Sequence, residues 1–257
     1  MELKIQPNKQ KKFDDLLVRV YEKRKEMGRA AAADVIEKMK SLLKEKETIR
    51  MVFASAPSQN EFLETLKNAS GIDWERVTVF HMDEYIGLKP KSEQSFSKFL
   101  CDRLFDGVEP GKIHLINGLN NAANECQVYS ELLNEAPIDI VCLGIGENGH
   151  IAFNDPPVAD FNDPEKIKMV MLDEVSRQQQ VNDEVFPHLD DVPTHALTLT
   201  IPALMSGSHL YCIVPGLTKR EAVRKTLTGL ISEIIPASIL RRHPDCTLYL
   251  DKDSYNE

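Results

Sequence analysis

A chain of 257 residues is long enough for one large α/β domain or two small ones with a substantial core. Its 42% hydrophobic and 28% charged residues are ordinary for a soluble globular protein. The formal net charge of −9 and the lack of a Lys/Arg run argue against a nucleic-acid surface. No apolar run approaches membrane-spanning length and no signal peptide precedes the charged N-terminus, so we expect a cytoplasmic protein.

The cysteines do not follow the pattern of a disulfide framework or a zinc site. They are odd in number, widely spaced and free of any C-x-x-C pair. Cys142 and Cys212 lie inside apolar, strand-like runs, so we expect them to be small core residues. This usage indicates a reducing compartment and gives no metal site. The five are Cys101, Cys126, Cys142, Cys212 and Cys246.

The N-terminal part of the chain is predicted to be helical. Residues 13–45 keep apolar residues at the i, i+3/i+4 spacing of an amphipathic helix. Gly28 is the expected break between two helices. We therefore expect residues 1–48 to form a helical segment packed on a single domain that comprises the whole chain, 1–257.

A possible anion-binding turn follows the first strand. Residues 49–54 predict a strand, and S-A-P-S-Q then leads into a helix at 60–66. Such a turn aims backbone N–H groups and a positive helix end at one spot, where Ser55 and Ser58 could donate to a phosphate. The alternative is an ordinary helix cap, for which Ser is also preferred.

Two adjacent carboxylates follow the next strand. Residues 77–80 predict a strand that runs directly into H-M-D-E-Y, which contains Asp83 and Glu84. Buried carboxylates are costly without a purpose. Neighbouring side chains on an extended segment point in opposite directions, so only one of the two should enter a site. The alternative is that both cap the following turn.

The segment 138–157 concentrates the residues most suited to chemistry. Its apolar, β-branched start predicts a strand buried on both faces, and strands and helices alternate up to this point, which predicts right-handed βαβ units and a mostly parallel sheet. Gly144, Gly146 and Gly149 let the backbone approach a ligand closely. His150 follows the last glycine, at the strand end where open α/β sheets bind ligands. The alternative is a tight turn with a structural histidine.

A second glycine turn follows later in the chain. Strands are predicted at 167–172, 195–201, 209–214 and 247–250, with helices near 173–181, 202–205 and 237–240. After the strand at 209–214, P-G-L-T-K opens a helix at 219–227. Lys219 then lies at a positive helix end, which is unfavourable unless an anion lies between them. This favours a phosphate-binding role for Lys219 over a plain surface lysine.

Five segments together resemble the glucosamine-6-phosphate deaminases. The turn G-I-G-E-N-G-H-I-A-F-N-D-P is similar to the family's G-x-G-x-D-G-H-I-A-F-N-E-P, and V-F-H-M-D-E-Y-I-G-L to its F-N-M-D-E-Y-V-G-L. Three further segments match in the same order, so that the resemblance covers about residues 50–251. They are I-H-L-I-N-G with the Glu125-Cys126 helix, H-A-L-T-L-T-I-P-A-L-M and V-P-G-L-T-K. The wider superfamily includes 6-phosphogluconolactonases, which share the G-x-G-x-D-G-H turn but not M-D-E-Y-x-G-L.

The resemblance implies a Rossmann-like α/β fold and conversion of an amino-sugar 6-phosphate into a ketose 6-phosphate and ammonia, without metal or cofactor. Asp83 matches the base that moves a proton between C2 and C1, and Glu84 is its neighbour, which orients the loop or contacts substrate. His150 matches the group that assists ring opening, a task suited to an imidazole. Asp155 matches a glutamate that hydrogen-bonds this histidine, and Lys219 a phosphate-binding lysine. The expected partner is a phosphosugar, with no nucleic acid or membrane and a possible homo-oligomer.

Three positions depart from the family's pattern. Asn148 stands where glucosamine-6-phosphate deaminases carry Asp, and enzymes resembling galactosamine-6-phosphate deaminases carry Asn there. The loop after the first predicted strand reads A-S-A-P-S-Q, where the family has a glycine-rich loop. Gln180 falls where the family places an arginine for the substrate phosphate, and Arg177, about one helical turn earlier, is the expected substitute.

These departures leave two alternatives to the deaminase. One is a lactonase-like hydrolase in which His150 acts as base on water. The other is a sugar-phosphate sensor with little catalysis, since Asn148 cannot stabilise an imidazolium by charge.

Overall fold

The computed structural model describes residues 5–89 and 91–255, and these form two sheets. The larger sheet has the strand order β1-β2-β11-β10-β7-β3-β4-β6. All of its paired strands are parallel except the β1–β2 hairpin. The strands span Lys9–Phe13 (β1), Leu16–Tyr21 (β2), Ile49–Phe53 (β3), Val77–His81 (β4), Lys112–His114 (β6), Ile140–Leu143 (β7), His209–Val214 (β10) and Cys246–Asp251 (β11).

A smaller antiparallel sheet stands beyond the end of β4. It has the order β5-β9-β8, with β5 at Asp83–Tyr85, β8 at Ile167–Met171 and β9 at His195–Leu199. Asp83 pairs with Thr198 and Tyr85 with Ala196. The chain therefore leaves the parallel sheet at His81 and enters the second sheet two residues later, which holds Asp83 in regular backbone. The expected single sheet is thus two sheets.

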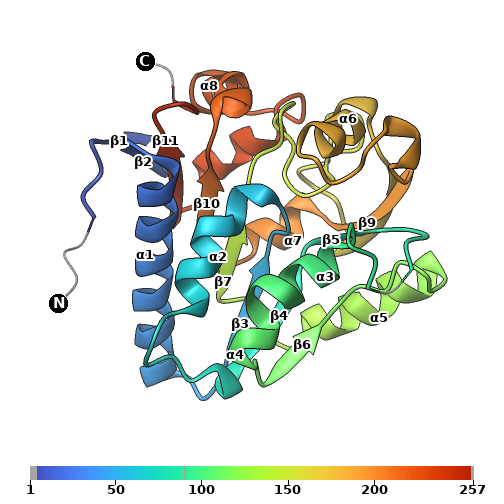
Figure 1. Cartoon of the computed structure of the whole chain (residues 1–257), viewed down its shortest axis with the longest axis horizontal. Helices are drawn as coiled ribbons and strands as arrows, with labels where there is room; N and C mark the ends of the chain where they lie inside the picture. The colour runs from blue at the N-terminus through green and yellow to red at the C-terminus, as the bar shows by residue number, and fades with distance from the viewer. Residues whose placement is uncertain (1–4, 90, 256–257) are drawn as a thin grey trace.

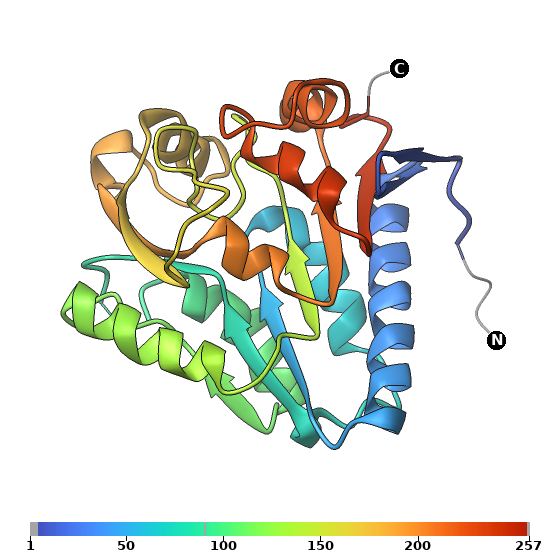
Figure 2. The ribbon, with the colours of Figure 1, turned by 180° about the vertical axis from the view of Figure 1, so that it is seen from behind.

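Helices cover both faces of the main sheet, as expected for an α/β domain (Figures 1 and 2). One core contains Met51 and Phe53 of β3 with side chains of α1, α2 and the π-helix. The other contains Val52 of β3 with side chains of α5, α7 and α8. Successive strand residues alternate between the two, which explains the continuous apolar runs. The helices are α1 Arg24–Glu45, α2 Asn60–Lys67, α3 Phe96–Leu100, π-helix Cys101–Phe105, α4 Asp106–Val108, α5 Ala122–Asn134, α6 Glu174–Asn182, α7 Ile201–Met205 and α8 Arg220–Thr228.

The prediction of two helices over residues 13–45 is wrong for its first part. Residues 9–21 form the β1–β2 hairpin, and β2 adds to the sheet beside β11. Leu16, Val18 and Val20 are buried at a period of two, which the helical spacing of Leu16, Leu17, Val20 and Tyr21 concealed. Gly28 is no break, because α1 runs through it from Arg24 to Glu45.

The strand order places a switch point between β3 and β7. From β3 the chain continues outward to β4 and β6, whereas from β7 it continues the other way to β10 and β11. In open α/β sheets this is where connections leave a crevice beyond the strands' carboxyl ends. Among the described helices, none is long and apolar enough to cross a membrane.

Candidate functional site

A cavity of about 260 Å³ lies at this switch point, beyond the carboxyl ends of β3, β4, β7 and β10. Ser55 and Ser58 follow β3, Asp83 follows β4, His150 follows β7, and Lys219 follows β10. All five side chains line the cavity, together with Gly146. The structure thus brings together groups that lie far apart in the chain, since Ser55 and Lys219 line the same cavity.

Asp83 is a buried carboxylate with no compensating partner. It is 6% exposed and lines the cavity, and its carboxylate accepts no hydrogen bond from any described side chain or backbone group outside the strands. Burial, and then the charge of Glu84, raise the pKa of Asp83 well above its ordinary value. Such a carboxylate is a stronger proton acceptor than one in water, once ionised.

Glu84 does not reach the cavity, as the alternation along β5 requires. Its Oε1 accepts hydrogen bonds from the backbone of Tyr85 (3.0 Å) and Phe96 (3.1 Å), and its Oε2 from that of Ser97 (2.9 Å). Burial raises its pKa, and these hydrogen bonds oppose the rise. Both oxygens are used in holding the start of α3 against β5, so the carboxylate organises the loop and has no free face for a substrate.

The glycine turn lets His150 lie directly against the backbone. A Cβ on Gly146 would come within 2.1 Å of the imidazole ring, so a larger residue would displace it. Gly149 has a φ of +90°, which other residues rarely adopt, and it lies outside the lining of the cavity. Gly149 therefore shapes the turn, and Gly146 makes room for the ring.

Three oxygens surround Nδ1 of His150. Asn148 Oδ1 lies 2.8 Å away, Ser176 Oγ 2.8 Å and Asp155 Oδ1 3.0 Å. Because the Asn148 amide nitrogen donates to Asp155 (2.8 Å), its oxygen faces the histidine as an acceptor. Nδ1 therefore carries the proton, and Nε2 makes no hydrogen bond with the described residues and is available to a ligand in the cavity.

Asp155 is the charged member of this group. Burial raises its pKa, but the hydrogen bond and charge of His150, helped by Asn148 and Ser176, outweigh burial and lower the pKa to about 2. Ser176 donates to the same carboxylate oxygen. Asn148 and Asp155 lie behind the ring and do not line the cavity. They hold the ring, and the Asp155 charge can stabilise an imidazolium.

Other side chains that line the cavity are suited to an anion. Ser55 Oγ is buried and has no hydrogen-bond partner among the described residues, whereas Ser58 Oγ accepts from Gln59 (3.0 Å). Lys219 is 6% exposed, and burial lowers its pKa against the opposing charges of Asp183 and Glu147. A bound anion would satisfy both the unpartnered hydroxyl of Ser55 and the desolvated ammonium of Lys219, which line the same cavity.

Arg177 does not reach the cavity. Its guanidinium donates to the carbonyls of Leu189 (2.8 Å) and Val192 (3.0 Å), which ties α6 to the loop after it. Gln180, one turn later on the same helix, does line the cavity. The expected substitution of an arginine at 180 by Arg177 therefore has no support in the geometry.

Several lining residues have no signal in the sequence pattern. Arg24 comes from the start of α1, and Gln179 and Asp183 from the region of α6; Ser176 stands behind His150. Each lies far along the chain from the motif it serves, in a helix whose polar residues have the spacing of any solvent-facing helix. From the sequence, site residues could be predicted only in the turns next to the strand ends.

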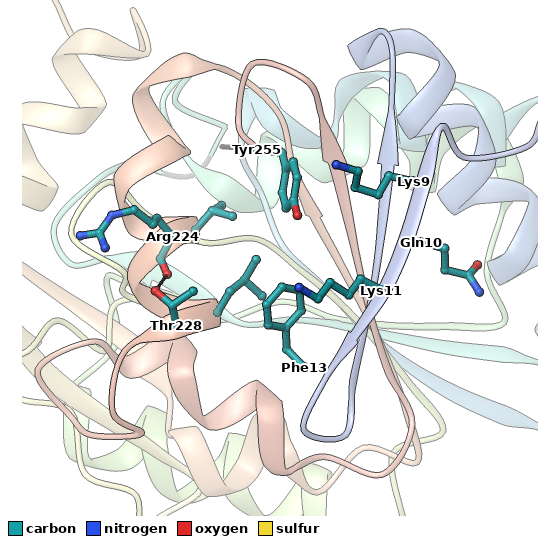
Figure 3. A pocket seen from close by; sticks show the side chains of 9 residues that line it. Lys9, Gln10, Lys11, Phe13, Arg224, Thr228 and Tyr255 are labelled. Atoms are coloured by element: carbon teal, nitrogen blue, oxygen red, sulfur yellow. Dashed lines mark hydrogen bonds between the residues drawn. The ribbon is translucent and has the colours of Figure 1, made fainter. Parts of the chain in front are cut away.

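A second hollow of the described structure lacks this chemistry. A groove of about 480 Å³ between the hairpin and α8 is lined by Lys9, Lys11, Phe13, Arg224 and Tyr255 among others (Figure 3). The Lys9 ammonium lies 5.5 Å from the centre of the Tyr255 ring. None of the nine lining residues is His, Asp or Glu, so this groove offers no group for proton transfer near neutral pH. In residues 5–89 and 91–255 no cluster of His, Cys, Asp or Glu could hold a metal ion.

The structure is that of a Rossmann-like α/β protein with a carboxylate, a histidine, two serines and a buried lysine around a cavity at the switch point. The family model described as glucosamine-6-phosphate isomerases/6-phosphogluconolactonase matches residues 22–249, and the chain belongs to this family.

Named relatives agree with this membership. A glucosamine-6-phosphate deaminase of Bacillus thuringiensis (strain Al Hakam) is 35% identical over 240 residues, covering 93% of this chain and 87% of the relative. The structure of a monomeric glucosamine-6-phosphate deaminase is 30% identical, with a TM-score of 0.84, and covers 92% of this chain and 98% of that one. A 6-phosphogluconolactonase of Thermotoga maritima shares the fold at 20% identity, with a TM-score of 0.76 and coverage of 92% and 100%.

Proposed function

We propose that the protein is an amino-sugar-6-phosphate deaminase/isomerase that converts glucosamine 6-phosphate or galactosamine 6-phosphate into a ketose 6-phosphate and ammonia. One observation carries the proposal. A buried carboxylate with a raised pKa, Asp83, shares a small cavity with a histidine whose Nδ1 is held by three oxygens. A base and an acid/base group in one pocket are what an aldose–ketose proton transfer requires. The named relatives at 35% and 30% identity support the substrate class.

Ring opening is assigned to His150. Nε2 takes the proton of the hydroxyl on C1, and the imidazolium so formed delivers this proton to the ring oxygen as the bond between C1 and that oxygen breaks, which gives the open-chain aldehyde. Asp155 stabilises the imidazolium that takes part, because its carboxylate lies 3.0 Å from Nδ1. Ser176 and Asn148 hold the ring in the one orientation that leaves Nε2 toward the cavity.

Isomerisation and ammonia release are assigned to Asp83. Its carboxylate takes the proton from C2, and the electron pair forms the double bond between C1 and C2 as the carbonyl electron pair moves onto O1; O1 takes a proton from the ammonium group on C2, which gives an enolamine. Return of the proton to C1 gives an imine at C2. Water then adds to C2 and ammonia leaves, so that one water is consumed for each ammonia and ketose formed. Among the described residues, the cavity is lined by two carboxylates, Asp83 and Asp183. Asp183 lies close to Lys219, so Asp83 is the one assigned as the base.

The phosphate is assigned to the turns that follow β3 and β10. Lys219 supplies an ammonium, Ser55 its unpartnered hydroxyl, and Ser58 a second hydroxyl at the start of the turn. Gly146 gives the sugar ring access to His150 because no side chain stands between them. Asn148 fits catalysis, since its amide bridges Asp155 and the histidine. Its presence is therefore no argument for a sensor.

The proposal is tested by measuring ammonia release from glucosamine 6-phosphate and galactosamine 6-phosphate, with 6-phosphogluconolactone hydrolysis measured beside them. We expect ammonia from at least one amino sugar and no acceleration of lactone hydrolysis. Lactone hydrolysis without ammonia would replace the deaminase by a hydrolase. Binding of the phosphosugars without either reaction would replace it by a sensor.

Two further predictions concern the setting of this activity. We propose that the protein works in the cytoplasm, supported by five cysteines that are all free thiols. Cell fractionation tests this location. A homo-oligomer is likewise a prediction from the family resemblance, and sedimentation of the purified chain at micromolar concentration tests it.

A further inference from the structure

Among the described residues, two cationic side chains line the cavity, Lys219 and Arg24. Arg24 is the first residue of α1 and lies at the mouth, with 39% of its side chain exposed. We propose that Arg24 is the second cation of the phosphate site and selects sugars that carry a phosphate dianion. The identity of the sugar rests on the proposed function, whereas the recognition of phosphate is argued from the geometry alone.

A close helix contact aims Arg24 at the turn after β3. Gly28, one helical turn after Arg24 on α1, lies against Glu61 of α2, where a Cβ would come within 2.7 Å of the Glu61 Cβ. Residues four apart share a helix face, so the same approach brings Arg24 over the start of α2. Its Nε donates to Glu61 Oε1 at 2.7 Å, and its Nη2 donates to the Pro57 carbonyl.

Arg24 and Glu61 each keep a hydrogen-bonding group that this ion pair does not use. The Nη1 group of Arg24 donates to no described residue, and Glu61 Oε2 is buried without a partner. A guanidinium is a planar fork that binds phosphate through two parallel hydrogen bonds, and here its outer edge is unused. The carbonyl of Pro57, which it holds, belongs to the same turn as Ser55 and Ser58.

Charge balance requires a second cation. A phosphate monoester carries about −1.5 to −2 charges near neutral pH. Lys219 supplies one positive charge, and Asp183 and Glu147 act against it from nearby. Gln180, which also lines the cavity, supplies none. Without Arg24, Lys219 alone would face the dianion. Arg24 adds a second cation at the turn after β3, and its partner Glu61, 2.7 Å away, offsets part of that charge.

The test compares Arg24→Gln, Glu61→Gln and Arg220→Gln. Arg220 lies beside Lys219 and donates to the Asp253 carbonyl, but it does not line the cavity, so it controls for the loss of a nearby positive charge. Two probes are used: inorganic phosphate, whose Kd is measured by calorimetry, and glucosamine 6-phosphate, whose KM and kcat are measured by ammonia release. Thermal unfolding verifies that each variant is folded.

For Arg24→Gln we expect both the Kd for phosphate and the KM to rise about 10- to 100-fold, the loss of a charge-assisted contact, with kcat little changed. Arg220→Gln should leave both within about twofold. Glu61→Gln keeps an acceptor for Nε and removes a negative charge, so phosphate should bind equally or more tightly. The two variants therefore distinguish two roles for Arg24. If Arg24 binds the ligand, only Arg24→Gln weakens phosphate binding; if the ion pair is merely structural, both variants weaken it.

The proposal is overturned if Arg24→Gln binds phosphate within twofold of the unaltered protein, if Glu61→Gln weakens binding as much, or if the unaltered protein binds no phosphate. The calorimetry needs no turnover. A tenfold loss of phosphate binding in Arg24→Gln, in a protein that releases no ammonia, would uphold Arg24 and reject the deaminase.

Discussion

Asp83 is the residue whose burial costs the most stability in the proposed site. It is buried, accepts no hydrogen bond from a described side chain and stands next to a second carboxylate, whereas Asp155, equally buried, is surrounded by His150, Asn148 and Ser176. The pKa values move in opposite directions for this reason. These opposite pKa shifts agree with the proposed roles, in which Asp83 is the base and Asp155 keeps a permanent charge.

Replacing Asp83 by Asn should stabilise the fold at neutral and alkaline pH. The raised pKa means that the folded state holds the proton more tightly than the unfolded chain. The ionised form therefore costs stability as pH rises above about 3.9, and the cost is complete above the raised folded pKa. We expect Asp83→Asn to raise the free energy of unfolding by about 0.5 to 2 kcal/mol at pH 8, with no gain near pH 3. Urea unfolding at the two pH values measures this.

Glu84→Gln is the matched control for that measurement. Both oxygens of Glu84 accept backbone hydrogen bonds, and an amide can replace only one of them. We expect a loss of about 1 to 3 kcal/mol instead of a gain. A gain for both variants, or for neither, would contradict the assignment of different tasks to the two carboxylates.

At the residue scale, the sequence predicted those site residues that directly follow a strand in the chain. Asp83, Asn148, His150 and Asp155 could be named because a turn and its polar residues are read together. Ser176 and Arg24 could not, because each reaches the site from a different helix. Arg177 was expected in place of an arginine at 180, but side-chain direction, which spacing does not give, turns it to the Leu189 and Val192 carbonyls.

At the scale of elements, one glycine decides how α1 and α2 pack. Gly28 lies inside α1, and its missing side chain lets Glu61 of α2 approach. In the sequence a glycine amid a helical pattern indicated a break, because the alternative, a close contact with another helix, needs the partner to be known. The hairpin was missed for a similar reason: residues 16–21 fit both a period of two and a helical stripe, and only pairing with β11 selects the strand.

Gly28→Ala should destabilise the protein despite the better helix propensity of alanine. Alanine is favoured by about 1 kcal/mol in an exposed helix. Here its Cβ would lie 2.7 Å from that of Glu61, and both belong to helix backbones that cannot move separately. We expect a net loss of about 1 to 3 kcal/mol in urea unfolding, and a higher KM as Arg24 is displaced.

Gly107→Ala gives the comparison. Gly107 is also helical, in α4, but its Cβ would meet the flexible end of Lys67, which can move aside. This variant should be neutral or more stable. Equal effects of the two substitutions would show that helix propensity, and not the contact between α1 and α2, governs position 28.

At the scale of the whole molecule, the strand order explains why the site is where it is. β3 and β7 are neighbours, and the chain departs from them in opposite directions, which opens the crevice that Ser55, His150 and Lys219 line. Alternating strands and helices predicted the parallel sheet and the strand end as the site. They did not predict the separate β5-β9-β8 sheet, because β5 pairs with β9, a segment more than a hundred residues further along the chain, and such pairing leaves no local pattern.

The measurement that tests the account most directly is the yield of ammonia and ketose 6-phosphate from glucosamine 6-phosphate and galactosamine 6-phosphate, with the unaltered protein and Asp83→Asn side by side. For at least one sugar the unaltered protein should give the two products in equal amounts. Asp83→Asn should give neither above background, while the same phosphosugar still raises its melting temperature. Equal turnover by Asp83→Asn, or no ammonia from either sugar with the unaltered protein, would contradict the assignment of this cavity to amino-sugar deamination.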